Sequence, residues 1–145
     1  MKTSDFFSLE EKKIIEEAIR KAELNTSGEI RVHIESDCKI EALDRATYIF
    51  EKLGMHKTEQ RNAVLFYIAI ADKKFAIIGD VGINIKVPAN FWDDIRSAMY
   101  ELFIEKKFAE GLEKGILMTG EQLKQHFPYQ SNDVNELSND VSFGN

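Results

Sequence analysis

The sequence predicts an α/β fold, a three-layer α-β-α sandwich with a small mixed sheet and the element order α-β-α-β-β-α-α. Residues 63–71, AVLFYIAIA, are apolar throughout, which is typical of a central strand buried on both faces. Amphipathic helical patterns flank this strand on both sides in the chain, so helices are available to cover both faces. A chain of 145 residues with 43% hydrophobic content suits one domain with a proper core.

The first half of the chain predicts a helix, a strand and a second helix. Ser8 and Glu11 form a capping-box pattern before an apolar stripe, which predicts a helix over residues 9–24. Residues 29–35, EIRVHIE, alternate strictly and predict a half-buried strand with one polar face. A second helix is expected over residues 40–53, with Gly54 at its C-terminal cap.

The second half predicts a β-hairpin followed by two helices. The apolar strand turns at Asp72-Lys73-Lys74 and pairs back through residues 75–79, and residues 83–87 are a candidate for a short fourth strand. One helix is expected after a cap at Asn90, and another over residues 109–126, before Pro128. We expect residues 1–128 to form one domain and residues 129–145 to be a disordered acidic-polar tail.

Composition and charge exclude several classes of function. The chain has 25 acidic and 19 basic residues, a net charge of −6, which disfavours binding to nucleic acid and to anionic lipid. A single cysteine, Cys38, allows no intrachain disulfide and fits a reducing compartment. The first residues lack the apolar segment of a signal peptide, and no long apolar run predicts a transmembrane segment. We therefore expect a soluble, cytoplasmic protein, and the oligomeric state stays open.

The motifs of common phosphoryl-transfer enzymes are missing. The sequence contains no P-loop, no cysteine followed by an arginine at phosphatase spacing, no D-x-D pair after an apolar strand, and no C-x-x-C or H-E-x-x-H zinc motif.

Two side chains on the polar face of the first strand are candidates for catalysis or anion binding. Arg31 and His33 are neighbours on this face and are suited to hold an anion such as phosphate. The alternative is an edge strand whose charged face meets solvent. A metal cluster is also conceivable from His33, Glu35, Asp37, Cys38 and His56, but the spacing is arbitrary and favours structural roles.

The stretch Gly79-Asp80-Val81-Gly82, with Asn84, is the candidate ligand-binding loop. It follows the end of a predicted strand, where α/β folds tend to place their sites. Oxygen ligands for a hard cation such as Ca²⁺ are available from Asp80, Asn84, Asp93 and Asp94. The alternative is a sharp turn with exposed acids, because the spacing is not that of an EF-hand. The loop also lacks the lysine and hydroxyl residue of a phosphate cradle.

The order of motifs resembles the TPM domain family. The features are TSGEIRVHIE at 26–35, RNAVLFYIAIADKKFAIIGDVGIN at 61–84 and FAEGLEKGILMTGEQLKQHFP at 108–128. The resemblance covers about residues 6–128 and implies an α/β sandwich. Some members are described as acid phosphatases, some bind calcium, and others are accessory factors in repair or assembly of membrane complexes.

The chain departs from the family in two respects. Members commonly carry a threonine-aspartate pair after the glycine loop, whereas IKVPANFW here has no acid before Asp93. Many bacterial relatives also have a signal peptide and a transmembrane helix. This sequence shows neither pattern, so we expect a stand-alone cytoplasmic variant of the family.

Two hypotheses follow. The first is a binding or accessory module that recognises a protein partner. The second is a metal-dependent phosphatase in which Asp80 with Asp93 or Asp94 holds a cation, calcium being the candidate cofactor, and Arg31 or His33 holds phosphate.

Overall fold

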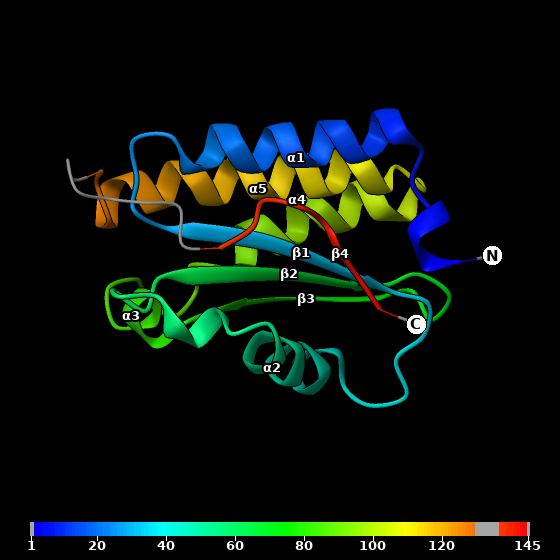
Figure 1. Cartoon of the computed structure of the whole chain (residues 1–145), viewed down its shortest axis with the longest axis horizontal. Helices are drawn as coiled ribbons and strands as arrows, with labels where there is room; N and C mark the ends of the chain where they lie inside the picture. Colours follow the sequence, from blue (N-terminus) through cyan, green and yellow to red (C-terminus); the bar gives the residue numbers. More distant parts are fainter. Residues whose placement is uncertain (1, 130–136, 145) are drawn as a thin grey trace.

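The structure is a computed structural model that describes residues 2–129 and 137–144. Figure 1 shows a small sheet between layers of helices, as the sequence predicts. The elements follow the order η1 (Thr3–Asp5), α1 (Leu9–Glu23), β1 (Glu29–Glu35), α2 (Ala42–Lys52), η2 (Met55–Lys57), β2 (Ala63–Ala69), β3 (Lys74–Gly79), α3 (Val81–Asn84), α4 (Asp93–Ile104), α5 (Phe108–His126) and β4 (Ser142–Phe143).

The sheet is mixed, with the strand order β3-β2-β1-β4 among the described residues. β1 runs parallel to β2 and to β4, whereas β2 and β3 form an antiparallel hairpin. Every residue of β2 is buried, which confirms the prediction of a central strand covered on both faces.

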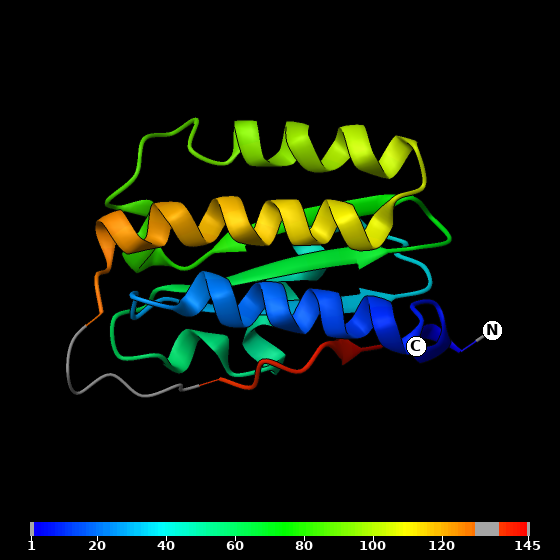
Figure 2. The ribbon, with the colours of Figure 1, turned by 90° about the horizontal axis from the view of Figure 1, so that it is seen from above.

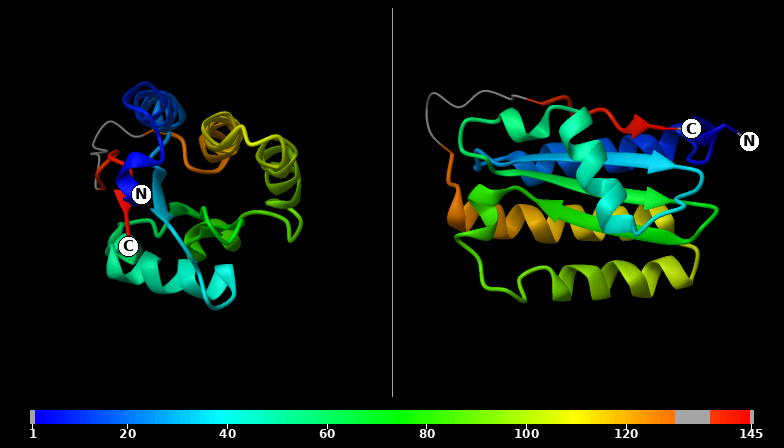
Figure 3. Two further views of the ribbon diagram at one scale, coloured as in Figure 1. Left: turned by 90° about the vertical axis from the view of Figure 1, so that its right-hand side faces the viewer. Right: turned by 90° about the horizontal axis from the view of Figure 1, so that it is seen from below.

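Helices cover the two faces unequally. The helices α1, α5 and α4 lie on one face, with α5 between the other two (Figure 2), and α2 lies on the opposite face (Figure 3). Ile30, Val32 and Ile34 of β1 join the larger apolar cluster beneath α1 and α5. Leu65 and Tyr67 of β2 join a smaller cluster beneath α2. None of the helices in the described part of the chain is long and apolar enough to cross a membrane.

Local sequence signals set most helix ends. Ser8 and Glu11 make both hydrogen bonds of the capping box at α1, and Gly54 adopts a φ of 71° after α2, the left-handed conformation that favours glycine. The expected cap at Asn90 is wrong, because α4 begins after Trp92. Trp92 packs under the end of β3, where a Cβ on Gly79 would lie 2.6 Å from its ring.

The polar face of β1 is buried, so the expectation of a charged face in solvent is wrong. Glu29, His33 and Glu35 are at most 5% exposed, and β1 lies between β2 and β4 rather than at the edge of the sheet. The alternation of polar and apolar residues remains, but both faces of the strand are covered.

The C-terminal residues differ from the expected tail. Ser142–Phe143 form β4 beside β1, and Val141 is buried, so this segment lies against the domain rather than in a disordered tail. Residues 130–136 of the predicted tail lie outside the described residues.

The suggested strand at 83–87 is also wrong, because Asp80 caps the short helix α3 and Ile83 of that helix is buried.

Candidate functional site

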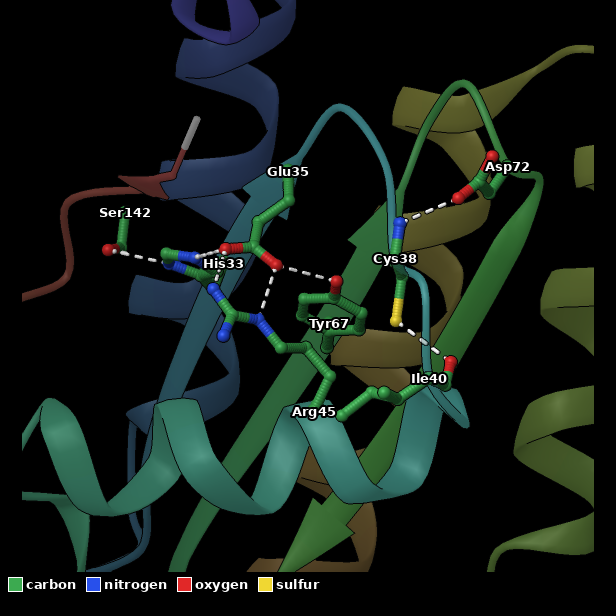
Figure 4. Close-up of polar contacts among 8 residues, drawn as sticks. All are labelled: His33, Glu35, Cys38, Ile40, Arg45, Tyr67, Asp72 and Ser142. Carbon is green, nitrogen blue, oxygen red and sulfur yellow. Dashed lines mark hydrogen bonds and ion pairs between the residues drawn. The ribbon is translucent and has the colours of Figure 1, made fainter.

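A cluster of polar side chains lies between α2 and the sheet, near the carboxyl end of β1 (Figure 4). Glu35 is its centre. Arg45 donates from Nε and Nη2 to the two carboxylate oxygens at 2.8 and 2.6 Å, and the Tyr67 hydroxyl donates to Oε1 at 2.7 Å. Burial alone would raise the pKa of Glu35, but the hydrogen bonds from Arg45 and Tyr67 lower it to about 2. Glu35 is therefore a carboxylate that keeps its charge although it is buried.

The sheet register brings these residues together. His33 is the register partner of Tyr67 on the neighbouring strand, and their rings stack at 6.2 Å. Side chains two residues apart share a face of a strand, so His33 and Glu35 both point toward α2. Arg45 lies in the first part of α2 and reaches Glu35 from this helix, which packs on the same face of the sheet.

His33 links the cluster to the C-terminal strand. Its Nδ1 lies 2.9 Å from the Ser142 Oγ, and its Nε2 lies 3.4 Å from Glu35 Oε2. Burial is the main cause that lowers the pKa of His33, so the ring is neutral at pH 7. In the tautomer with its proton on Nε2, that proton faces the carboxylate and the Ser142 hydroxyl donates to Nδ1. At 3.4 Å, Nε2 makes no hydrogen bond within the described part of the chain.

A cavity of about 560 Å³ opens beside this cluster, lined by His33, Glu35, Asp37, Cys38, Lys39, Ile40, Arg45, Ile49, Lys52, Leu53, Ser142, Phe143 and Gly144. The serine, histidine and glutamate resemble a nucleophile with its base and orienting acid. However, the Glu35 oxygens already accept hydrogen bonds from Arg45 and Tyr67, and burial lowers the pKa of His33 although the nearby carboxylate opposes this.

The loop after β1 is fixed to the β2–β3 turn. The Cys38 N–H donates to Asp72 at 2.7 Å, its thiol donates to the Ile40 carbonyl at 3.2 Å, and the Lys74 ammonium donates to the Cys38 carbonyl at 2.9 Å. Cys38 and Asp72 therefore stabilise one wall of the cavity.

The conceivable five-residue metal cluster is not assembled. His33 and Glu35 meet and Cys38 borders the same cavity, but His56 lines a different one. Within residues 2–129 and 137–144, no group of three or more His, Cys, Asp or Glu side chains is placed to hold a metal ion. Arg31 lies on the same face as His33, and its Nε is buried without a hydrogen-bond partner among those residues.

Asp80 lies in an ion pair rather than in an open loop. Arg61 donates to both its carboxylate oxygens at 2.7 and 2.9 Å, and the Val81 N–H donates to Oδ1 at 2.7 Å. Asn84 donates to the Gly79 carbonyl at 3.0 Å. A Cβ on Gly82 would collide with the carbonyl oxygens of Gln60 and Arg61, so close packing explains this glycine.

The predicted calcium ligands have separate surroundings. Asp80 and Asn84 border a cavity of about 490 Å³ together with Arg61, Trp92 and Arg96. Asp93 is exposed and pairs with Arg96 at 2.7 Å, and Asp94 is exposed. In the part of the chain that the structure describes, the three aspartates do not form a ligand set, and calcium binding stays a prediction.

Asp80 and His33, one from each predicted site, lie apart along the parallel strands. Asp80 follows β3, which runs antiparallel, and its N–H donates to Ala63 at the start of β2. His33 pairs with Tyr67, four residues and about 13 Å further along the sheet. The loop is therefore not at the carboxyl end of the parallel strands, and the structure does not bring Asp80 and His33 into one phosphatase site.

Sequence reasoning missed three residues of the cluster, Arg45, Tyr67 and Ser142. Tyr67 carried a signal, because a tyrosine in a wholly buried strand needs a partner for its hydroxyl. No signal in the sequence indicated Arg45 or Ser142, because neither residue is at a regular spacing from Glu35 or His33 in the sequence.

Comparisons with known proteins agree with the fold. The family model TPM_phosphatase, described as the TPM domain, matches residues 1–122. The solved structure of BA42 from the psychrophilic bacterium Bizionia argentinensis is 45% identical, with a TM-score of 0.91 over 99% of each chain. No curated protein matches the chain.

Two more distant structures share the fold alone. The N-terminal domain of cg2496 from Corynebacterium glutamicum is 13% identical, with a TM-score of 0.66 over 81% of this chain and 74% of its own. An N-terminal domain of a protein from P. gingivalis is 17% identical, with a TM-score of 0.67 over 88% and 85%. On the match to residues 1–122 and the 45% identity to BA42, the chain belongs to the TPM domain family.

Proposed function

We propose that this TPM domain is a binding module that recognises an extended segment of a partner protein by strand addition at the outer edge of β1. One observation carries the proposal: the chain's own C-terminal residues lie on this edge as a parallel strand. Strand addition is a common way to recognise a peptide, with backbone hydrogen bonds for affinity and side-chain contacts for specificity.

The bound segment makes contacts of both kinds. Ser142 and Phe143 pair with His33 and Ile34, and the Gly144 N–H donates to the Ile34 carbonyl at 2.8 Å. The Ser142 hydroxyl contacts His33. A Cβ on Gly144 would lie 2.5 Å from Glu35 Oε2. The edge therefore selects a small hydroxyl residue at one position and glycine two positions later.

The outer edge of β1 is longer than the strand that covers it. β1 has seven residues and β4 has two. At the other end of β1, the Ile30 N–H donates to the side chain of Glu23 at 2.9 Å instead of to a strand. Because β4 is so short, a longer partner strand has more of this edge to bind than the chain's own segment uses.

The proposal extends to the biological setting of the protein. The resemblance to accessory factors supports a role in repair or assembly of membrane complexes, and the single cysteine supports a cytoplasmic setting. The buried cluster contributes a rigid surface to this role, since Arg45 and Tyr67 hold Glu35 in place beside His33.

A labelled peptide tests the proposal. A peptide of residues 137–144 is titrated, with fluorescence anisotropy as the readout, into the full chain and into its Gly144→Ala variant. We expect tighter binding to the variant, because the added methyl group weakens the contact between the chain's own C-terminal segment and β1. In the natural chain this segment is present at high local concentration and competes with the peptide for the edge.

Two control peptides carry Ser142→Ala or Gly144→Val, and both should bind more weakly than the parent peptide. Binding of the parent peptide to neither protein, or equal binding of all three peptides, would contradict strand addition at this edge.

A metal-dependent phosphatase is the second candidate, supported by the family name TPM_phosphatase and by the two arginines, Arg61 and Arg96, that border the Asp80 cavity. A calcium titration followed by backbone NMR tests it. Shifts at residues 79–84 and 93–94 would support this candidate, and none at millimolar calcium would contradict it. Hydrolysis of p-nitrophenyl phosphate that survives Asp80→Ala would remove Asp80 from the mechanism.

A further inference from the structure

An apolar cavity lies at the other edge of the sheet, where β3 is the last strand in the described residues. Its volume is about 540 Å³, within the range of small-molecule sites. It is lined by Ile68, Ala69, Ile70, Lys73, Lys74, Phe75, Tyr100, Phe103, Ile104, Lys106 and Phe108. The proposed docking edge on β1 shares none of these residues.

Aromatic rings form the body of this cavity. Phe103 packs edge-to-face on Phe75 with centroids 5.0 Å apart and lies 5.6 Å from Phe108. Tyr100 and Ile104 on α4 extend this apolar surface outward, at 58% and 62% exposure. The cavity therefore offers a ligand a partly enclosed surface for an aliphatic or aromatic body.

Lysines are the charged residues among those that line this apolar surface. Among the described residues that line the cavity, Lys73, Lys74 and Lys106 are basic and none is acidic. The Lys74 ammonium is directed to the carbonyls of Cys38 and Ile40. Neither Lys73 nor Lys106 pairs with an acid within residues 2–129 and 137–144, so two ammonium groups are left for a ligand although the whole chain is acidic.

Both of these lysines adopt the left-handed conformation, with φ of 53° for Lys73 and 63° for Lys106. Lys106 follows α4, and the next N–H, that of Lys107, donates to the Leu102 carbonyl. In a helix end of this kind, glycine usually occupies the position that Lys106 has here. Lys73 occupies the turn between β2 and β3. Figure 3 shows that this turn and the α4–α5 connection lie at the same end of the molecule. Glycine at these two positions would relieve the backbone strain. Instead, both positions are lysines, and both border the same cavity.

We propose that this cavity binds a small amphipathic anion, an aliphatic or aromatic carboxylate whose apolar body packs on Phe75, Phe103 and Phe108. The carboxylate then lies between the ammonium groups of Lys73 and Lys106. This site does not depend on the proposed recognition of a partner strand, because it uses the opposite edge of the sheet.

Octanoate is the probe, and the readout is backbone and aromatic NMR shifts of the full chain. We expect shifts at Phe75, Tyr100, Phe103 and Ile104. Octylamine has the same tail with the opposite charge, and acetate has the same head without a tail; both should bind more weakly by about tenfold or more. Equal binding of octylamine, or no shifts at millimolar octanoate, would overturn the proposal.

Two variants separate binding from stability. Lys73→Gly and Lys106→Gly each relieve a left-handed lysine, so Tm should not fall, while affinity for octanoate should drop about tenfold. Asn25→Gly is the matched control, because Asn25 has a φ of 65° but does not line the cavity. It should bind octanoate like the natural chain. Natural affinity in both lysine variants would contradict the assigned carboxylate position.

Discussion

Arg45 donates two hydrogen bonds to Glu35 and so joins α2 to the end of β1. The Glu35 side chain is 5% exposed and that of Arg45 is 33% exposed. Through Tyr67 and His33 this pair also contacts β2 and β4. One carboxylate thus connects three strands with the helix that covers them.

Removing Arg45 should strongly destabilise the protein. Arg45→Met keeps much of the side-chain stem but leaves a buried carboxylate with too few partners, which should lower the free energy of unfolding by roughly 2–4 kcal/mol. Urea unfolding measures this. Arg96→Met is the control, because the Arg96–Asp93 pair is exposed and should contribute less than about 1 kcal/mol. Equal losses in the two variants would contradict a special role for Arg45.

Glu35 should make stability fall in acid. Its pKa is about 2 in the fold against 4.5 for an ordinary glutamate. Its contribution is therefore complete above pH 4.5 and is lost as the pH falls toward 2. The difference in free energy of unfolding between the natural chain and Glu35→Gln should shrink over this range. A difference that stays constant between pH 5 and pH 2.5 would contradict this prediction.

Glu23 should have the opposite dependence on pH. Burial and the neighbouring Glu29 raise its pKa from 4.5 to about 8, although the Ile30 N–H opposes this. The folded state then holds a proton that the unfolded state releases above pH 4.5, so this residue lowers stability as the pH rises from 4.5 to 8. Glu23→Gln mimics the protonated carboxyl and should raise Tm above that of the natural chain at pH 8.5. The two Tm values should converge near pH 4.5, and a constant offset would count against the raised pKa.

Gly82 should tolerate no side chain. A Cβ there collides with the Gln60 and Arg61 carbonyl oxygens, and backbone cannot move aside as a flexible side chain does. Gly82→Ala should lower the free energy of unfolding by roughly 2–3 kcal/mol. Gly54→Ala is the comparison, because a Cβ there would make only an ordinary contact with the Lys57 side chain, although φ is 71°, and it should lose about 1 kcal/mol. Chemical denaturation compares the two, and a smaller loss for Gly82→Ala would be contrary to the observed packing.

The sequence predicted the elements that local signals determine. The capping box of Ser8 and Glu11, the left-handed Gly54 and the unbroken apolar run of β2 each specify structure within a few residues. The three-layer fold follows from them, because a strand that is apolar on both faces needs helices on both sides.

The site was less predictable because its contacts are far apart in sequence. The polar face of β1 is typical of a strand that meets water, and the strand that covers its edge begins more than a hundred residues later. His33 and Ser142 are 109 residues apart. A two-residue strand such as β4 carries no periodic pattern, so nothing local indicated that the tail would return to the sheet.

The central claim is that the outer edge of β1 accepts an extended segment, and an NMR titration tests it most directly. Unlabelled peptide of residues 137–144 is added to the labelled Gly144→Ala chain. Along β1 the N–H groups of Ile30, Val32 and Ile34 alternate toward this edge. We predict shifts concentrated on β1 and slowed hydrogen exchange at Val32 and Ile34. Shifts confined to other parts of the molecule, or exchange at Val32 and Ile34 that the peptide does not change, would contradict the account.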